Sequence, residues 1–218
     1  MVSKITVLYG NIAYVNADMH VNSSNGFLLH GSGTAEQYAD YSGSVVGDEL
    51  QEFWNLVNIA KEPLKSPLDH MYRIRKREPT RFQYESLEDM VVSRDSRPLK
   101  RGDAVIPITI NNLQISNAVG MTYDWKKSPP KLIPATKKTV QDSLEKSFGF
   151  AKKLGCKSVA IPVMCTRKGG LSKEESSEAT LFAIESSGNS IDKIFIVLYN
   201  DELLKNKQFF DEFYKDAL

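Results

Sequence analysis

From residue 139 onward the sequence alternates between helical and strand patterns, and this alternation limits the fold more than any other feature. Thr139–Leu154 places its apolar residues on one helical face and ends at Gly155. Lys157–Met164 and Lys193–Tyr199 are apolar runs typical of buried strands. A helix opened by Ser172, and a second over Leu203–Tyr214, follow these strands. The alternation predicts an α/β sandwich with a largely parallel sheet.

The earlier part of the chain contributes further elements. Lys4–Tyr9 is rich in β-branched and aromatic residues and stops at Gly10, which indicates a strand. The remaining expected elements are strands at Tyr14–Asn22, Asp103–Thr109 and Leu113–Val119, and helices at Ala35–Tyr41 and Asp48–Ala60.

Composition excludes several classes of protein. The 218 residues include 28 Lys and Arg against 27 Asp and Glu, so no overall charge favours nucleic acid or a membrane surface. No apolar run approaches the ~20 residues of a membrane span, and the chain enters a strand pattern too early for a signal peptide. We therefore expect a cytoplasmic protein whose two cysteines, Cys156 and Cys165, are reduced. No residue spacing suggests a metal site, and no cofactor is expected.

Residues 44–101 interrupt the regular pattern. The segment contains several prolines and a basic cluster over Arg73–Arg81, with Glu and Asp residues beside it. The apolar content of residues 61–101 is too high for a free tail, so we expect this part to pack on the domain. Interaction with nucleic acid or protein through this segment is one alternative function, although mixed charge of this kind is more typical of a solvated surface.

Three loops follow predicted strands, where ligands bind in α/β sheets. They are Gly10–Tyr14, Asn22–Ala35 and Cys165–Leu171. The third reads C-T-R-K-G-G-L between a strand and a capped helix. Its glycines let backbone N–H groups approach a ligand, so Thr166–Gly170 is a candidate phosphate cradle without a Walker motif.

Short segments in this order resemble the macrodomain family, whose members recognise ADP-ribose. In chain order they are KITVLYGNI at Lys4–Ile12, ADMHVNSSN at Ala17–Asn25, LLHGSGTAE at Leu28–Glu36, GDAVIP at Gly102–Pro107, NAVG at Asn117–Gly120 and SVAIPVMCTRKGG at Ser158–Gly170. The resemblance spans residues 4–43 and 102–200. It implies one macro-type domain over residues 1–218 with an insertion at 44–101. The implied fold is a three-layer α/β/α sandwich with a mixed, largely parallel central sheet.

The resemblance also implies a function and a site. ADP-ribose, or a nucleotide derived from it, would bind in a cleft at the carboxyl ends of the strands, and an ADP-ribosylated protein becomes a further partner. Asn11 and Ile12 would meet the adenine, Asn25 the distal ribose, and Tyr199 the adenosine. The implied ligand-binding residues are Asn11, Ile12, Asn25, Gly31, Ser32, Gly33, Thr34, Cys165, Thr166, Arg167, Lys168, Gly169, Gly170, Leu171, Tyr199 and Asn200.

Departures from the family pattern bear on catalysis. Hydrolytic members use an Asn, matched by Asn25, and an Asp whose position here holds Ala35, with Glu36 beside it. We name Asn25 and Glu36 as candidate catalytic residues and keep an ADP-ribosyl hydrolase as the alternative function, with weak or absent hydrolysis expected. The alternative interpretations are a turn-capping Asn25, an exposed helix-terminal Glu36, and solvated side chains at Arg167 and Lys168.

Overall fold

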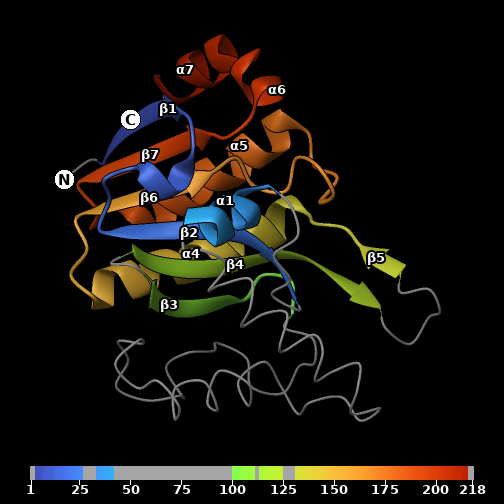
Figure 1. Cartoon of the computed structure of the whole chain (residues 1–218), viewed down its shortest axis with the longest axis horizontal. Coiled ribbons are helices and arrows are strands. Elements are labelled where there is room, and N and C mark those ends of the chain that lie inside the picture. Colours follow the sequence, from blue (N-terminus) through green and yellow to red (C-terminus); the bar gives the residue numbers. More distant parts are fainter. Residues whose placement is uncertain (1–2, 27–32, 42–99, 111–112, 125–130, 216–218) are drawn as a thin grey trace.

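The computed structural model describes residues 3–26, 33–41, 100–110, 113–124 and 131–215. Its centre is a sheet with the strand order β1–β7–β6–β2–β4–β3, and β5 pairs with the C-terminal end of β4. Neighbours from β1 to β4 in this order run parallel, whereas β3 and β5 run antiparallel to β4 (Figure 1). The sheet is therefore mixed and largely parallel, as predicted.

The elements have the following bounds. The strands are β1 (Lys4–Tyr9), β2 (Met19–Asn25), β3 (Ala104–Ile110), β4 (Leu113–Asp124), β5 (Lys131–Ile133), β6 (Ser158–Pro162) and β7 (Lys193–Leu198). The helices are the 3-10 helix η1 (Ile12–Tyr14), α1 (Thr34–Tyr41), α4 (Lys137–Lys153), α5 (Lys173–Ala183), the π-helix η4 (Ile184–Gly188), α6 (Asp201–Leu204) and α7 (Lys207–Lys215).

Helices cover both faces of the sheet and make the three layers of the predicted α/β/α sandwich. On one face α4 packs against α5 and α5 against α7, above β4 and β1 (Figure 1). Ile194 and Ile196 of β7 share a buried cluster with Leu144 and Phe148 of α4. On the opposite face α1 lies over β2, where the rings of Tyr38 and His20 meet edge to face, and η1 contacts α1 and β6.

The α4 helix illustrates how local sequence and packing agree. Thr136 and Thr139 form a reciprocal capping box at its N-terminus. Val140, Leu144 and Phe148 then fall on one face at helical spacing and are fully buried. Full burial of each such side chain contributes about 1.5–3 kcal/mol. The predicted helix Thr139–Leu154 is confirmed, with its start two residues earlier.

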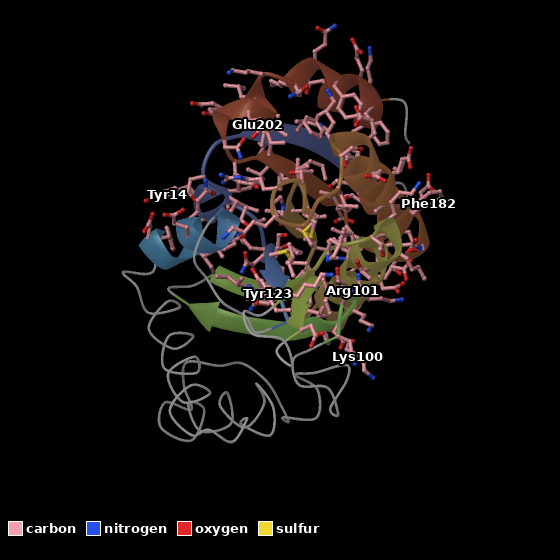
Figure 2. The ribbon with its side chains drawn as sticks, turned by 90° about the vertical axis from the view of Figure 1, so that its right-hand side faces the viewer. Tyr14, Lys100, Arg101, Tyr123, Phe182 and Glu202 are labelled. Carbon is pink, nitrogen blue, oxygen red and sulfur yellow. The ribbon has the colours of Figure 1, made fainter. Side chains whose placement is uncertain are left out.

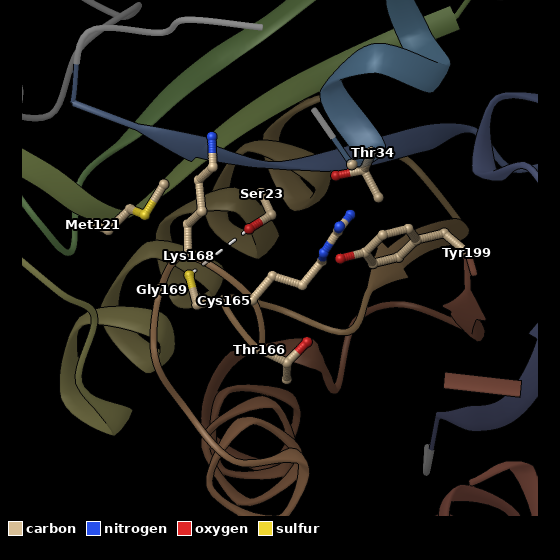
Figure 3. Close-up of a pocket in the computed structure, with 10 residues that line it drawn as sticks. Ser23, Thr34, Met121, Cys165, Thr166, Lys168, Gly169 and Tyr199 are labelled. Atoms are coloured by element: carbon tan, nitrogen blue, oxygen red, sulfur yellow. Dashed lines mark hydrogen bonds between the residues drawn. The ribbon is translucent and has the colours of Figure 1, made fainter. Parts of the chain in front are cut away.

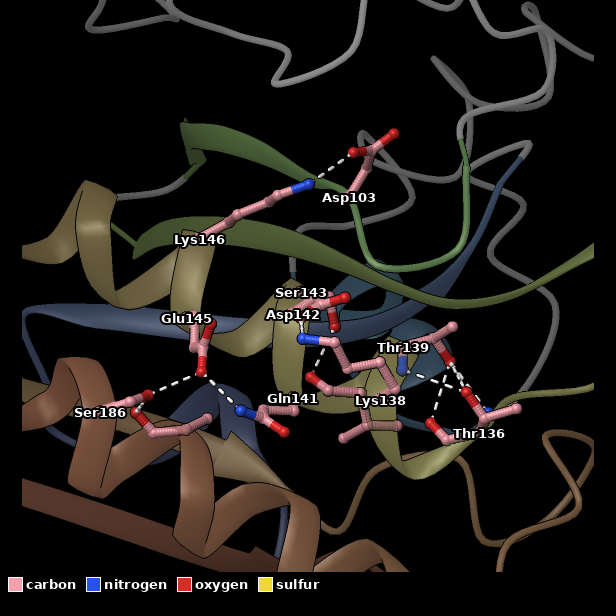
Figure 4. A network of polar contacts seen from close by, with 12 residues as sticks. Asp103, Thr136, Lys138, Thr139, Gln141, Asp142, Ser143, Glu145, Lys146 and Ser186 are labelled. Carbon is pink, nitrogen blue, oxygen red and sulfur yellow. Dashed lines mark hydrogen bonds and ion pairs between the residues drawn. The ribbon is translucent and has the colours of Figure 1, made fainter.

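Polar contacts on the other side of α4 fix it to its neighbours (Figure 4). Lys146 Nζ lies 2.8 Å from the buried carboxylate of Asp103, just before β3. Glu145 accepts hydrogen bonds from Gln141 and from the Ser186 hydroxyl on η4. These contacts join α4 to the antiparallel edge of the sheet and to the helix layer beside it.

The region after β1 differs from the prediction. We expected a strand over Tyr14–Asn22, but Ile12–Tyr14 forms a 3-10 turn because the Asn11 side chain accepts a hydrogen bond from Ala13 N. β2 begins only at Met19 and continues through Asn25, which the sequence suggested was loop. Its polar residues are accommodated because the backbone pairs in parallel with β4.

Three other expectations need correction. β4 extends to Asp124 rather than Val119, and β5 was not predicted. The expected helix Leu203–Tyr214 is two helices, α6 and α7, because the chain turns at Lys205–Asn206. The capping box of Ser172 and Glu175 at α5 is confirmed, and Cys156 and Cys165 are free of a disulfide and buried.

Some expectations fall outside the described residues, namely the helix Asp48–Ala60 and residues 44–99 of the segment 44–101. Within the described ranges, no helix is both long and apolar enough to span a membrane. Tyr14 and Phe182 are exposed aromatic residues on opposite sides of the molecule (Figure 2).

Candidate functional site

A cavity of about 150 Å³ opens at the carboxyl ends of the parallel strands β2, β6 and β7. One wall is the loop that follows β6, and the facing walls come from β2, from the start of α1 and from the residue after β7 (Figure 3). The lining residues are Ser23, Gly33, Thr34, Met121, Cys165, Thr166, Arg167, Lys168, Gly169 and Tyr199.

Backbone hydrogen bonds curl the loop after β6 into a compact turn. Leu171 N donates to Cys165 O and Gly170 N to Arg167 O, at 3.1 and 3.0 Å. Gly169 O accepts from Ala135 N of the segment before α4. Cys165 has φ +60°, an uncommon conformation for a residue with a side chain. The closed turn holds this strained residue at the cavity wall.

The charge of the cavity is positive. Arg167 and Lys168 are exposed on its rim, and none of the described residues that line it carries a carboxylate. Burial raises the pKa of Tyr199, and the positive charge of Arg167 partly opposes that rise. Tyr199 is therefore a neutral hydroxyl at neutral pH. The cavity can hold an anionic group by charge, by loop amides and by hydroxyl groups.

Cys165 contributes packing rather than reactivity. Its side chain is buried, and burial raises the pKa of its thiol to about 11, although the Ser23 hydroxyl 3.7 Å away favours the thiolate. A thiol with so high a pKa is almost entirely protonated at neutral pH and is a weak nucleophile.

Among the described residues no cluster of His, Cys, Asp and Glu could hold a metal ion.

Gln37 on α1 connects the walls of the site. Its Oε1 accepts a hydrogen bond from Ile12 N, and its Nε2 donates to Tyr199 O, both at 3.1 Å. Beside it, Thr34 Oγ1 donates to Asn22 Oδ1, and Asn22 Nδ2 donates to Asn117 Oδ1. One helix therefore positions the turn after β1, the end of β7 and the polar interior of β2 together.

The structure brings many of the predicted site residues together. Eight of them line the cavity, and their roles toward a ligand stay predictions: Gly33, Thr34, Cys165, Thr166, Arg167, Lys168, Gly169 and Tyr199. Leu171 and Asn200 line a second cavity beside the first. Gly170 is exposed at the end of the same loop.

Other predicted residues lie apart from the lining. Asn11 caps η1 with its side-chain oxygen, and Ile12 is fully buried beneath it. Asn25 is buried at the end of β2. Glu36 is exposed in the first turn of α1, as in its alternative interpretation. Gly31 and Ser32 fall outside the described residues.

Three residues of the site were not predicted, namely Ser23, Met121 and Gln37. Ser23 belongs to a segment that was interpreted as loop, and its strand pairing with β4 places it in the wall. Met121 directly follows the NAVG segment, which was its only signal. Gln37 acts through contacts 25 and 162 residues away along the chain, which no local pattern reveals.

No family model matches the sequence, and no curated protein matches it. The fold, however, matches solved structures. The macrodomain of Trypanosoma brucei in complex with ADP-ribose superposes with a TM-score of 0.59 at 11% identity, over 94% of this chain and 68% of that one.

Two further macrodomains are similar. The macro domain of ganglioside induced differentiation associated protein 2 has a TM-score of 0.59 at 15% identity, over 99% of this chain and 87% of that one. The Oceanobacillus iheyensis macrodomain with MES bound has a TM-score of 0.57 at 16% identity, over 99% and 94%. The sheet order, the helix layers and these superpositions agree with the resemblance in the sequence, and the chain has the macrodomain fold.

Proposed function

We propose that the protein binds ADP-ribose, or a nucleotide derived from it, in the cavity at the carboxyl ends of β2, β6 and β7. The loop Cys165–Gly169 carries the proposal. Its backbone is curled and it contains two cations, Arg167 and Lys168, while no described residue that lines the cavity has a carboxylate. A diphosphate offers several anionic acceptors to such amides and cations. The fold shared with the Trypanosoma brucei macrodomain, which was solved with ADP-ribose, supports this ligand class.

The remaining walls suit the rest of such a nucleotide. Tyr199 offers an aromatic face on which a base can pack, and stacking of this kind is worth about 1–3 kcal/mol per base. Gly33 and Thr34 lie on the same side as Tyr199, where a Cβ atom on Gly33 would come within 3.8 Å of the Tyr199 ring, and these small residues leave space for a ribose. Gly170 N and Leu171 N donate within the loop, so we assign the phosphate to the amides of Thr166–Gly169.

Binding is favoured over hydrolysis. A hydrolase needs a group that orients or activates water beside the anomeric carbon. Glu36 is exposed on α1 and does not line the cavity, and residues 27–32 contain no Asp or Glu. Rapid release of labelled ADP-ribose from a modified protein would instead favour the hydrolase.

Calorimetric titration with ADP-ribose, NAD, AMP and a poly-ADP-ribose fragment tests the proposal. We expect ADP-ribose to bind, and Tyr199→Ala to weaken it about tenfold or more through loss of the aromatic face. Tyr14→Ala is the matched control, because Tyr14 is 74% exposed and does not line the cavity. Absence of ADP-ribose binding by the folded parent protein would contradict the proposal.

A further inference from the structure

A second cavity, of about 310 Å³, adjoins the first on the side of α5 and α6. Thr166 and Arg167 line both cavities, so the loop after β6 forms the partition between them. The other lining residues are Leu171, Ser172, Lys173, Asn200, Glu202, Leu203 and Asn206.

The Lys173 ammonium group is held at the wall of this cavity by neutral partners. Its Nζ donates to Asn206 Oδ1 at 2.5 Å and lies 4.8 Å from the centre of the Phe209 ring. The nearest carboxylate in an ion pair with it is that of the half-exposed Glu174, at 3.9 Å. Asn206 is itself fixed, because its Nδ2 donates to Glu202 O. An ammonium group has three donors, so Lys173 keeps donor capacity for a further acceptor besides Asn206.

The balance of charge in the second cavity is also positive. Arg167 and Lys173 face one lining carboxylate, Glu202, among the described residues. At the start of α5 the capping box engages the Ser172 and Glu175 amides, and the positive balance counted here is that of side chains. Thr166 Oγ1 lies buried at the partition and interacts with the Tyr199 hydroxyl, so Thr166 joins the two cavities by a polar contact.

The volumes of the two cavities suggest that one ligand occupies both. Pockets for drug-sized ligands usually measure ~300–1,000 Å³, and the first cavity alone is smaller at about 150 Å³. The two together fall within that range. A ligand that extends past Thr166 and Arg167 would meet the positioned Lys173 next.

We propose that the second cavity binds a phosphoryl group that ADP-ribose itself lacks, so that the preferred ligand is a nucleotide with an additional phosphate beyond its diphosphate or 5′-phosphate. Lys173 and Arg167 bind the added phosphate, and Asn206 positions Lys173. This inference rests on the proposed function, because the first cavity must hold the nucleotide.

The test compares ligands that differ by one phosphate. Affinities are measured for ADP-ribose against ADP-ribose 2′-phosphate, and for AMP against adenosine 3′,5′-bisphosphate. In at least one pair we expect the added phosphate to strengthen binding about three- to tenfold at low salt, and less at high salt. Lys173→Gln should remove this gain and leave the affinity for ADP-ribose unchanged.

Lys205→Gln is the matched control, since Lys205 follows α6 and does not line the cavity. It should keep the full gain. The inference is overturned if neither added phosphate strengthens binding, if the gain survives in Lys173→Gln, or if Lys173→Gln weakens both ligands of a pair equally. In each of these outcomes ADP-ribose still binds and the proposed function stands, whereas failure of every ligand to bind would overturn the proposed function itself.

Discussion

At the scale of single residues, the loop after β6 depends on how closely Gly169 approaches Cys165. A Cβ atom at position 169 would lie 2.4 Å from Cys165 Cβ and 2.5 Å from Cys165 O. Contacts under 3 Å with backbone atoms cannot be relieved by rotating a side chain, so the backbone must shift. The same shift would disturb the strained φ of Cys165 and the hydrogen bond from Leu171 N to Cys165 O.

We therefore expect Gly169→Ala to reduce the affinity for ADP-ribose about tenfold or more, equivalent to ~1.4 kcal/mol, because the loop backbone is displaced from the cavity wall. Calorimetric titration measures the loss, and circular dichroism checks that the fold remains. Gly149→Ala is the control, because Gly149 is exposed on α4 with no atom within 4 Å of an added Cβ. It should bind normally and gain roughly 0.5–1 kcal/mol in stability. Unchanged affinity in Gly169→Ala would remove this loop from the site.

The sequence predicted those site residues whose role follows from the local structure of the loop after β6. The glycines and the capped helix after Cys165 predicted a phosphate cradle because turn chemistry is local. Ser23, Met121 and Gln37 enter the site through strand pairing and long-range hydrogen bonds. Ser, Met and Gln are common residues and these three belong to no motif, so no sequence pattern marked them as site residues.

At the scale of elements, α5 begins directly after the loop and so fixes its end. Ser172 accepts a hydrogen bond from Glu175 N, and the Glu175 carboxylate accepts one from Ser172 N. These bonds satisfy two amides of the helix terminus, and a neighbouring hydrogen bond joins Leu171 N to Cys165 O. The start of α5 and the loop are therefore coupled.

Ser172→Ala should lower the free energy of unfolding by ~1 kcal/mol, the usual cost of losing an N-cap side chain. Urea unfolding monitored by circular dichroism measures it, with an unchanged m-value expected. Ser172→Asp restores an N-cap acceptor and should return stability close to that of the parent. Equal stability of the alanine variant and the parent would mean that the box contributes nothing.

Elements with a strong local signal were predicted, whereas a break set by tertiary contacts was not. The α4 helix has a cap, a buried face and a terminal glycine, and its prediction is confirmed. The break between α6 and α7 has neither Gly nor Pro. It arises from Asn206, whose backbone N–H bonds Leu203 O while its side chain contacts Lys173 and Glu202. That combination includes a tertiary contact, which periodicity does not record.

At the scale of the whole molecule, the two faces of the sheet have different character. The face under α4, α5 and α7 is an apolar core, whereas the face under α1 buries polar side chains of β2 such as His20 and Asn22. Burial of polar groups costs free energy unless hydrogen bonds compensate it. The alternation of strand and helix predicted the sandwich, but it could not assign the polar face, because that face is buried by the tertiary contact of α1 with β2.

This polar face gives stability a pH dependence, since His20 is fully buried. Burial lowers its pKa to about 4, and nearby carbonyl groups of Ile12, Ala17 and Val15 offset only part of the effect. In the unfolded chain the pKa is ~6.5. Above that value His20 is neutral in both states. Between ~6.5 and ~4 the unfolded state binds the proton more readily, so stability is lost as the pH falls.

We expect the free energy of unfolding to fall by up to about 2 kcal/mol from this group between pH 6.5 and 5, at ~1.4 kcal/mol per unit. Urea unfolding at pH 7 and pH 5 measures the loss of stability, and His20→Leu should make this loss smaller by up to about 2 kcal/mol.

Asp18→Asn is the control. Although burial alone would raise the pKa of Asp18, hydrogen bonds from Lys157 N and Ser158 hold it below its usual range. Asp18 therefore titrates below this window, and its variant should retain the parent's full loss between pH 7 and 5. An equal loss in His20→Leu and the parent would mean that His20 does not cause the dependence.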